Sequence, residues 1–202
     1  MVPALVAALL VAPPPFIAHA GPVTAKQLDG SYHVGCPVGP ASLRLLRLSY
    51  WGFDGRSHAG ALVVNRAVVS DVTIVFRTLY RARFPIRRLE PVSTYGGSDE
   101  RSMAADNTSG FNCRFAVAPG PKHWSVHAYG EAVDVNPVEN PYVEDGRVHP
   151  AAGRRFLDRT RYRPGMAVAD GLLVQTFASV GWSWGGRWAA TPDYQHFSAT
   201  GG

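Results

Sequence analysis

The most informative stretch for the fold is Ser125-Val-His-Ala-Tyr-Gly-Glu-Ala-Val-Asp-Val-Asn136. Its last four residues alternate between apolar and polar side chains, as a strand with one buried face does. Val133 and Val135 therefore face one side of the strand, and Asp134 faces the other. Gly130 permits a sharp turn just before this strand. The stretch thus predicts a loop that leads into a short strand, with a carboxylate displayed from the strand's polar face.

Hydrophobic periodicity predicts the other elements of the chain. Alternation or short apolar runs predict strands, whereas the apolar residues from Val72 to Leu79 recur at the spacing of an amphipathic helix. We expect strands at 42–50, 61–64, 86–92, 132–136 and 195–198, a helix at 68–82 that ends before Pro85, a polar loop at 93–112, and a helix capped by Asp170 with an apolar face from Leu173 to Val180. This order predicts an α+β fold with a small antiparallel sheet that carries the functional side chains and is flanked by helices.

The composition is that of one folded domain. The chain has 202 residues, of which 46% are hydrophobic and 17% charged, which is enough for one compact domain and too few for two. Its 21 glycines and 16 prolines are scattered between apolar runs. This distribution favours a single, loop-rich globular domain over a disordered chain.

The first twenty residues have the features of an export signal. They combine an apolar stretch from Val2 to Ala12 with a proline-rich bend and the small-x-small ending Ala18-His-Ala20. We expect a signal peptide at 1–20, cleavage before Gly21, and a secreted domain at 21–202. No Lys or Arg precedes the apolar stretch, so an upstream start or a structural N-terminus are the alternatives. No other run approaches transmembrane length, so we expect no membrane span in the mature protein.

The chain contains two cysteines, Cys36 and Cys113. In an exported protein an even number of cysteines favours a disulfide, which would tie the N-terminal arm to the middle of the domain. Two buried free thiols are the alternative. Metal binding by these cysteines is disfavoured because the chain has no Cys-x-x-Cys pair.

The formal net charge of +5 comes mainly from arginines, which cluster at 81–88 and 154–163. A basic surface attracts an anionic cell wall, or a nucleic acid, without specificity. Solvated helix and loop faces account for the same charges without any partner. Because no nucleic-acid-binding motif accompanies the arginines, we expect no specific nucleic-acid partner.

Two segments carry side chains of the types that bind metals. The first offers His127 and Asp134, and the second, Asp193-Tyr-Gln-His196, offers His196. Zinc in hydrolases commonly takes three His or carboxylate ligands and leaves the fourth position to water. Peptide hydrolysis also needs a general base, for which Asp193 is the candidate. In a regular strand Asp193 and His196 would point to opposite faces, so this role requires a turn, which Pro192 favours.

The pattern Ser-x-His-x-x-Gly-x-Ala-x-Asp at 125–134, followed by Asp-x-x-His at 193–196, resembles the zinc D-alanyl-D-alanine carboxypeptidase family. That family includes D-Ala-D-Ala dipeptidases and L-Ala-D-Glu endopeptidases. Further stretches resemble an exported bacterial branch of the family: Cys36-Pro37, Gly52-Phe-Asp-Gly55, Phe84-Pro-Ile86, residues 102–109, Phe111-Asn-Cys-Arg114, Asn136-Pro137, Asn140-Pro-Tyr142 and residues 181–188. Together these motifs are specific, whereas separately only the segment at 125–134 is.

The resemblance implies one zinc ion held by His127, Asp134 and His196, with Asp193 as the catalytic base. Aspartate stands at 193 where the family's dipeptidases have glutamate. Its shorter reach argues against dipeptidase activity in particular.

The resemblance also implies an arginine near the metal that stabilises the oxyanion. In the family it usually follows a Ser-Gly-Tyr-type strand end, but Ser93-Thr-Tyr-Gly96 has no arginine beside it. Arg114 is the candidate substitute, because its planar fork suits carboxylate oxygens and a developing oxyanion. A structural salt bridge is the alternative for Arg114. Ser125 is a candidate for binding substrate or orienting a metal ligand, and Asp106 is a further candidate of that kind.

The function implied by the resemblance is zinc-dependent hydrolysis of peptidoglycan stem peptides at the cell wall. We expect a monomeric carboxypeptidase or endopeptidase that cleaves bonds involving D-residues. The alternative is a non-catalytic cell-wall binding module that retains the zinc fold; a purely structural site would not need Asp193. Trp182, Trp184 and Trp188 are candidates for a groove wall, with packing as the alternative.

Overall fold

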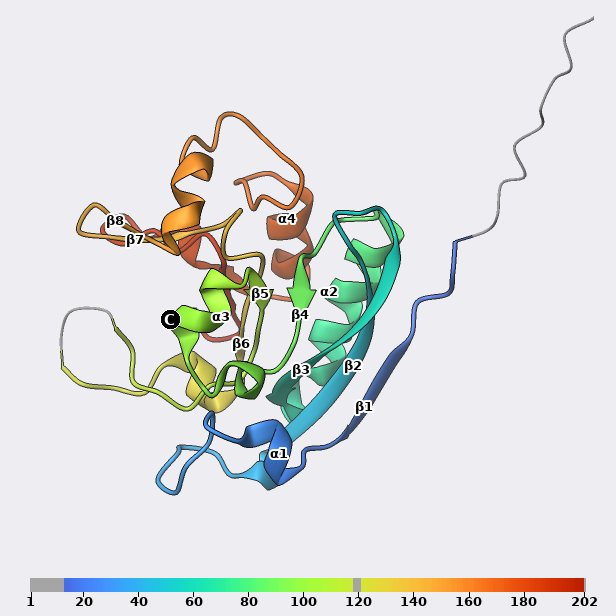
Figure 1. Ribbon diagram of the computed structural model, residues 1–202, viewed down its shortest axis with the longest axis vertical. Helices are drawn as coiled ribbons and strands as arrows, with labels where there is room; N and C mark the ends of the chain where they lie inside the picture. The colour runs from blue at the N-terminus through green and yellow to red at the C-terminus, as the bar shows by residue number, and fades with distance from the viewer. Residues whose placement is uncertain (1–12, 118–120, 202) are drawn as a thin grey trace, which may run out of the picture.

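The computed structural model describes residues 13–117 and 121–201. Residues 1–12 of the predicted signal peptide therefore lie outside the described residues. Within the described ranges, no helix is long and apolar enough to cross a membrane. These residues form one compact α+β domain, which confirms the predicted fold class (Figure 1).

Three antiparallel strands form the first sheet, in the order β1 (Ala18–Pro22), β2 (Leu43–Trp51) and β3 (Ser57–Asn65). The strands predicted at 42–50 and 61–64 are confirmed, although β3 begins earlier because it pairs with β2 as far as Ser57. A hydrogen bond of 3.0 Å from the Gly55 N–H to the Gly52 carbonyl closes the turn between them. The edge strand β1 was not predicted, and it includes Ala18, His19 and Ala20 from the predicted signal peptide.

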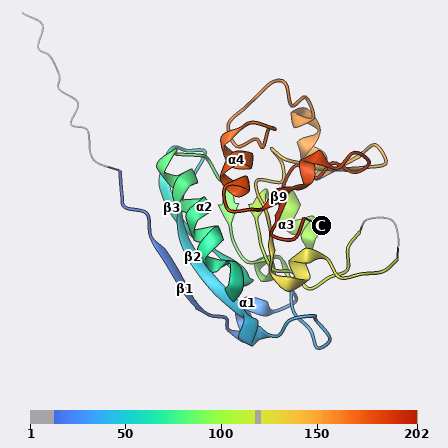
Figure 2. The same ribbon diagram turned by 180° about the vertical axis from the view of Figure 1, so that it is seen from behind.

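Helix α2 (Val69–Arg81) covers one face of this sheet (Figures 1 and 2). Its buried side chains recur every three or four residues, as predicted, and include Val72, Val75, Phe76 and Leu79. Burial of each such side chain contributes about 1.5–3 kcal/mol. The helix predicted at 68–82 is confirmed, and the chain leaves it before Pro85 through Arg83, whose φ of 53° is left-handed.

A second sheet places the functional side chains. Its strands are short and antiparallel, in the order β6 (Ala132–Asp134), β10 (His196–Ser198) and β9 (Ser183–Trp184). Val133 and Val135 enter the main core together with Phe197, which stacks on Phe177 of α4 (Leu172–Ala178) at a ring distance of 4.1 Å. The opposite side of β6 carries Asp134. The alternation in the sequence thus predicted which face of β6 is buried.

The segment at 86–112 differs from its prediction. In place of a strand at 86–92, the chain forms only β4 (Arg88–Leu89), which pairs in parallel with β5 (Asn107–Thr108). The predicted polar loop contains the 3-10 helix η3 (Val92–Tyr95) and helix α3 (Asp99–Ala104). Ser98 caps α3 by accepting a 3.2 Å hydrogen bond from the Arg101 N–H, and two acidic residues occupy the first turn.

Asp170 does not cap α4, contrary to prediction. Gly171 occupies the N-cap position with an extended backbone, and no side chain caps this helix. Asp170 instead accepts a hydrogen bond from the Gln175 side chain through its backbone carbonyl. The remaining elements are α1 (Ala25–Leu28), η1 (Pro40–Ser42), η2 (Arg66–Val68), η4 (Val126–Tyr129), β7 (Tyr142–Glu144), β8 (Arg147–His149), η5 (Ala151–Phe156) and η6 (Gly185–Arg187).

Cys36 and Cys113 form the predicted disulfide, with a Cα–Cα distance of 5.9 Å. The bond joins the arm that follows α1 to the segment that follows β5. Because 77 residues separate the two cysteines, closing this loop in the unfolded chain contributes about 4 kcal/mol in the chain-entropy treatment.

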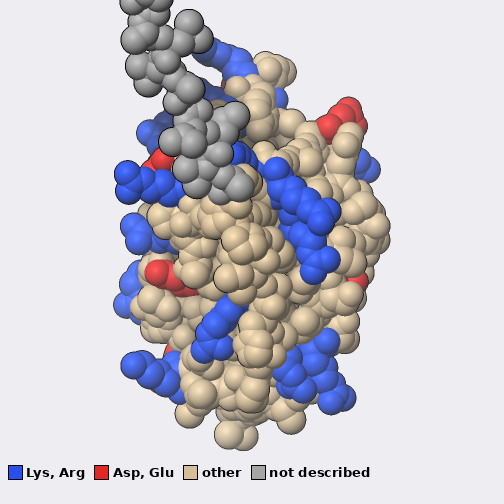
Figure 3. Space-filling view, turned by 90° about the vertical axis from the view of Figure 1, so that its right-hand side faces the viewer, with Lys and Arg blue, Asp and Glu red and all other residues tan. Residues whose placement is uncertain are grey.

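Arginines are spread over the face that carries α2 and β1 instead of forming one patch (Figure 3). Several of them pack on aromatic rings. The Arg83 guanidinium lies 4.8 Å from the Trp51 ring centroid, and that of Arg87 lies 4.0 Å from Phe53. These contacts give the arginine cluster at 81–88 a packing role of its own.

Candidate active site

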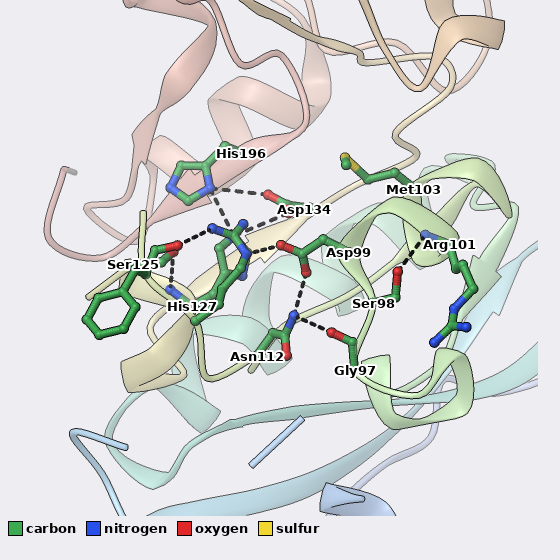
Figure 4. A network of polar contacts seen from close by, with 12 residues as sticks. Gly97, Ser98, Asp99, Arg101, Met103, Asn112, Ser125, His127, Asp134 and His196 are labelled. Carbon is green, nitrogen blue, oxygen red and sulfur yellow. Dashed lines mark hydrogen bonds and ion pairs between the residues drawn. The ribbon is translucent and has the colours of Figure 1, made fainter. Parts of the chain in front are cut away.

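Three structural elements bring His127, Asp134 and His196 together (Figure 4). His127 lies in η4, Asp134 ends β6 and His196 begins β10. Because β6 and β10 pair with Asp134 directly opposite His196, these two side chains project from neighbouring positions. All three side chains are buried.

The ligand atoms of the three side chains lie at the corners of a small triangle, in which each histidine approaches a different carboxyl oxygen of Asp134. His127 Nε2 lies 3.1 Å from His196 Nδ1 and 3.2 Å from Asp134 Oδ2, and His196 Nδ1 lies 3.2 Å from Asp134 Oδ1. A tetrahedral zinc site with bonds of about 2.0–2.1 Å places its ligand atoms about 3.3 Å apart. The three residues therefore fit a single zinc ion and constitute a possible metal site.

The loop around His127 is shaped to present one nitrogen to this site. His127 Nδ1 lies 2.7 Å from the Gly110 carbonyl, which can accept a hydrogen bond only if Nδ1 is protonated, so Nε2 is left free for a metal. Ser125 caps η4 by accepting a hydrogen bond from the His127 N–H. Gly130 ends η4 with a φ of 71°, and a Cβ there would meet the Asn65 nitrogen at 2.7 Å. The turn predicted at Gly130 is thus confirmed.

Asp193 lies in a turn that places it beside the three ligands. The His196 N–H donates a hydrogen bond of 3.3 Å to the Asp193 carbonyl, and such a bond between residues i and i+3 defines the turn that the sequence analysis required. The Asp193 N–H in turn donates to the Gly185 carbonyl at the start of η6. One carboxyl oxygen of Asp193, Oδ1, is shielded from solvent and has no hydrogen-bond partner among the described residues.

The two aspartates differ in charge state. Burial raises the pKa of Asp193 to about 7, and the charge of Asp134 raises it further. Burial also acts to raise the pKa of Asp134, but the neighbouring His127 and His196 outweigh it and hold that pKa well below its usual range. Asp134 is thus anionic, as a metal ligand must be, whereas Asp193 can both accept and release a proton near neutral pH.

These groups open into one cavity of about 580 Å³. Its polar lining includes His127, Asp134, Asp193, His196, Arg114 and Ser125, and its apolar lining includes Met103, Trp124, Val126, Tyr142 and Trp188. Of the three candidate groove tryptophans, Trp188 lies against His196 at a ring distance of 5.3 Å, whereas Trp182 and Trp184 pack in the core. The cavity therefore offers charged groups on its floor and apolar walls for the rest of a ligand.

Arg114 lies in this cavity and forms an ion pair with Asp99. Its Nη1 also donates a 3.2 Å hydrogen bond to the Phe115 carbonyl. Burial lowers the pKa of Arg114, while the charges of Asp134 and Asp193 act in the opposite direction. The salt bridge that the sequence analysis gave as an alternative is present, and the arginine faces the site as well.

A comparison with protein families matches residues 119–199 to the model of D-alanyl-D-alanine carboxypeptidases. This segment contains both sequence motifs and all three metal-ligand candidates. Over these residues, the chain is similar to the D-alanyl-D-alanine carboxypeptidase family. Comparisons with curated proteins and with solved structures give no match. Arg114 and Asp99 lie before the matched segment.

Asp106 is not brought to the candidate active site. Its backbone is left-handed, with a φ of 57°, and its Oδ1 accepts a 2.8 Å hydrogen bond from the Val138 N–H. Its other oxygen lies 3.5 Å from Arg87, which also approaches Glu139 at 3.8 Å. Asp106 therefore belongs to a charge cluster in which the two carboxyl groups are buried and Arg87 is partly exposed, and it is not among the residues that line the cavity.

This cluster predicts that a Glu139→Gln variant gains thermal stability relative to the wild type as pH rises. Burial raises the pKa of Glu139 to about 8, above its unfolded value of 4.5. The hydrogen bond with Asp106 and the charge of Asp106 act in the same direction. The folded state therefore binds the proton more tightly, and the stability that this contributes is lost as pH rises from 4.5 through 8. Glutamine has no proton to lose. Tm measured at pH 5 and pH 9 should shift in favour of Glu139→Gln at pH 9, and an equal Tm difference at both values would refute this account.

Tyr142 and Asp99 line the cavity of the candidate active site, but neither was a candidate site residue in the sequence. Tyr142 in β7 forms a backbone bridge with Asp193, and burial raises its pKa to about 12. The Asn140-Pro-Tyr142 motif carried a signal for Tyr142. For Asp99 the available signal was the Ser98 cap, which predicts a helix start but not its position beside Arg114.

Proposed function

We propose that the chain is a zinc-dependent peptidase that hydrolyses peptidoglycan stem peptides, as a carboxypeptidase or an endopeptidase at bonds involving D-residues. The observation that carries this proposal is the position of Asp193 in the same cavity as the triangle of His127, Asp134 and His196. A purely structural zinc site has no use for a further carboxylate beside its three ligands. The match to the D-alanyl-D-alanine carboxypeptidase model supports the substrate class.

His127, Asp134 and His196 would hold one zinc ion. A zinc ion bound there would polarise the scissile carbonyl and lower the pKa of the attacking water toward about 7. Asp193 would take a proton from the attacking water and later give it to the departing amine, which is a role suited to a carboxyl group with a pKa raised toward neutrality. The apolar walls formed by Trp188 and Tyr142 exclude bulk water from this proton transfer.

Arg114 and Ser125 are the proposed substrate-binding groups. Both line the cavity, and the backbone N–H of Ser125 donates a 3.0 Å hydrogen bond to the Arg114 carbonyl, which holds the two residues side by side. The planar guanidinium can bind a substrate carboxylate or the developing oxyanion. The Ser125 hydroxyl is placed either to bind substrate or to orient the His127 loop that it caps.

We propose that the protein is exported and acts at the cell wall. The segment at 1–20 has the features of a signal peptide, and the disulfide suits an oxidising compartment. Export would change the first sheet, because cleavage before Gly21 removes three of the five residues of β1. The register of β2 and β3 does not depend on those residues.

Metal analysis combined with a peptide-release assay tests this function. Purified protein should contain one zinc per chain and release peptides from purified cell walls. Release should stop when a chelator removes the metal, and stoichiometric zinc should restore it. A protein that holds stoichiometric zinc but releases nothing would instead be a non-catalytic binding module of the same fold.

A further inference from the structure

Arg114 lines the cavity, and its guanidinium is bound by two other groups of the protein. Nε pairs with Asp99 Oδ2, and Nη1 donates to the Phe115 carbonyl at 3.2 Å. These two contacts fix the orientation of the planar head along one edge.

Asp99 is itself fixed to the segment that carries the metal-ligand loop (Figure 4). Its Oδ1 accepts a 2.6 Å hydrogen bond from the side-chain amide of Asn112, which is buried and also donates to the Gly97 carbonyl at 3.1 Å. The Asn112 backbone N–H donates to the His127 carbonyl at 3.1 Å. A continuous set of contacts therefore joins the first metal ligand, Asn112, Asp99 and Arg114.

Two carboxylates that line the cavity attract the Arg114 guanidinium in competition with Asp99. The charges of Asp134 and Asp193 both act on it. An arginine side chain has about 2 kcal/mol of rotamer entropy, so an unrestrained guanidinium samples many positions and is drawn toward such carboxylates. A direct pair with Asp193 would neutralise the base, and a pair with Asp134 would compete for a metal ligand.

We propose that Asp99 is a positioning residue that holds Arg114 ready for substrate and keeps it away from Asp134 and Asp193. This inference rests on the proposed peptidase function and adds a residue that lies before the matched family segment. The Asp99 carboxylate supplies the negative charge that pairs with Arg114, and the hydrogen bond from Asn112 fixes the orientation of that carboxylate. A displacement of about 1 Å in such a group can cost about 100-fold in rate.

A double-mutant cycle tests the proposal. Asp99→Ala, Arg114→Ala and the double variant are compared with the wild type in the rate of peptide release from purified cell walls. Asp99→Ala alone should lower the rate by about 10- to 100-fold with zinc content unchanged. In the Arg114→Ala background, the same change should alter the rate less than about twofold, because Asp99 acts only through Arg114.

Two further variants separate positioning from folding. Asp99→Asn keeps an oxygen for the Asn112 amide but lacks the charge, so it should fold like the wild type and still lose activity. Asp170→Ala removes an exposed aspartate remote from the cavity and should leave the rate unchanged. Thermal unfolding of each variant shows whether a loss of rate reflects a loss of fold.

The rates of these variants distinguish failure of the positioning role from failure of the peptidase function. Equal losses from Asp99→Ala in the wild-type and Arg114→Ala backgrounds would overturn the positioning role, as would full activity of a folded Asp99→Asn variant. In either case the proposed peptidase function would stand. A wild-type protein that holds zinc but releases no peptide would overturn the function itself.

Discussion

Asp193→Asn and Asp193→Ala are expected to keep stoichiometric zinc and to lose peptide release by about 10²–10⁴-fold. Asp193 is not one of the three residues of the metal triangle, so its removal leaves that triangle intact. It does remove the group whose pKa burial raises to about 7, and with it the proton acceptor for the attacking water. The asparagine variant is nearly isosteric, so the shape of the cavity is retained. Zinc content and initial rates of release on the same cell-wall preparation check this result.

The matched control for this prediction is Asp170→Asn, which changes an exposed aspartate on the surface. It should behave like the wild type in both measurements. A folded Asp193→Asn variant with a release rate within about twofold of the wild type would contradict the role of Asp193 as the base. Loss of zinc from Asp193→Asn would instead make Asp193 part of the metal site.

His127→Ala is expected to lose the metal and, with it, all measurable hydrolysis. The change removes one of three ligand atoms, and its effect on zinc affinity should exceed the roughly 10- to 100-fold that loss of a supporting hydrogen-bond partner costs. It also leaves the Gly110 carbonyl without its 2.7 Å contact to Nδ1. Zinc per chain, measured after dialysis, should fall from about one to near zero.

His58→Ala provides the control for this prediction, because His58 is half-exposed on β3 and its ion pair is with Asp54. It should retain zinc and activity. Because His127 is buried, the Tm of the His127→Ala variant must be compared with that of metal-free wild type. If His127→Ala binds zinc as tightly as the wild type, the metal lies elsewhere in the chain.

Local pattern predicted much of the fold. The spacing from Val72 to Leu79 specified α2, and the alternation around Asp134 specified which side of β6 is buried, because both patterns reflect burial of a single face. Residue types and the family resemblance suggested the three candidate ligands, which the fold brings together. Gly130 could be interpreted correctly since its left-handed turn is a property of its own backbone.

Contacts between segments that are distant in the sequence could not be predicted from the local pattern of residues. Asp99 and Arg114 lie in different elements, and only the folded chain shows that they form an ion pair. Asp106 was a candidate site residue in the sequence, but in the folded chain its side chain approaches Arg87. Helix α3 was missed since it is short and has only one buried side chain, Ser102, so it lacks apolar periodicity.

Mass spectrometry of muropeptides after digestion of purified cell walls tests the central claim most directly. The account predicts that the wild-type protein produces shortened or split stem peptides with a new end next to a D-residue, and that Asp193→Asn does not. The cleaved bond then distinguishes a carboxypeptidase from an endopeptidase. A muropeptide profile identical to that of untreated walls, from wild-type protein that holds one zinc per chain, would contradict the account.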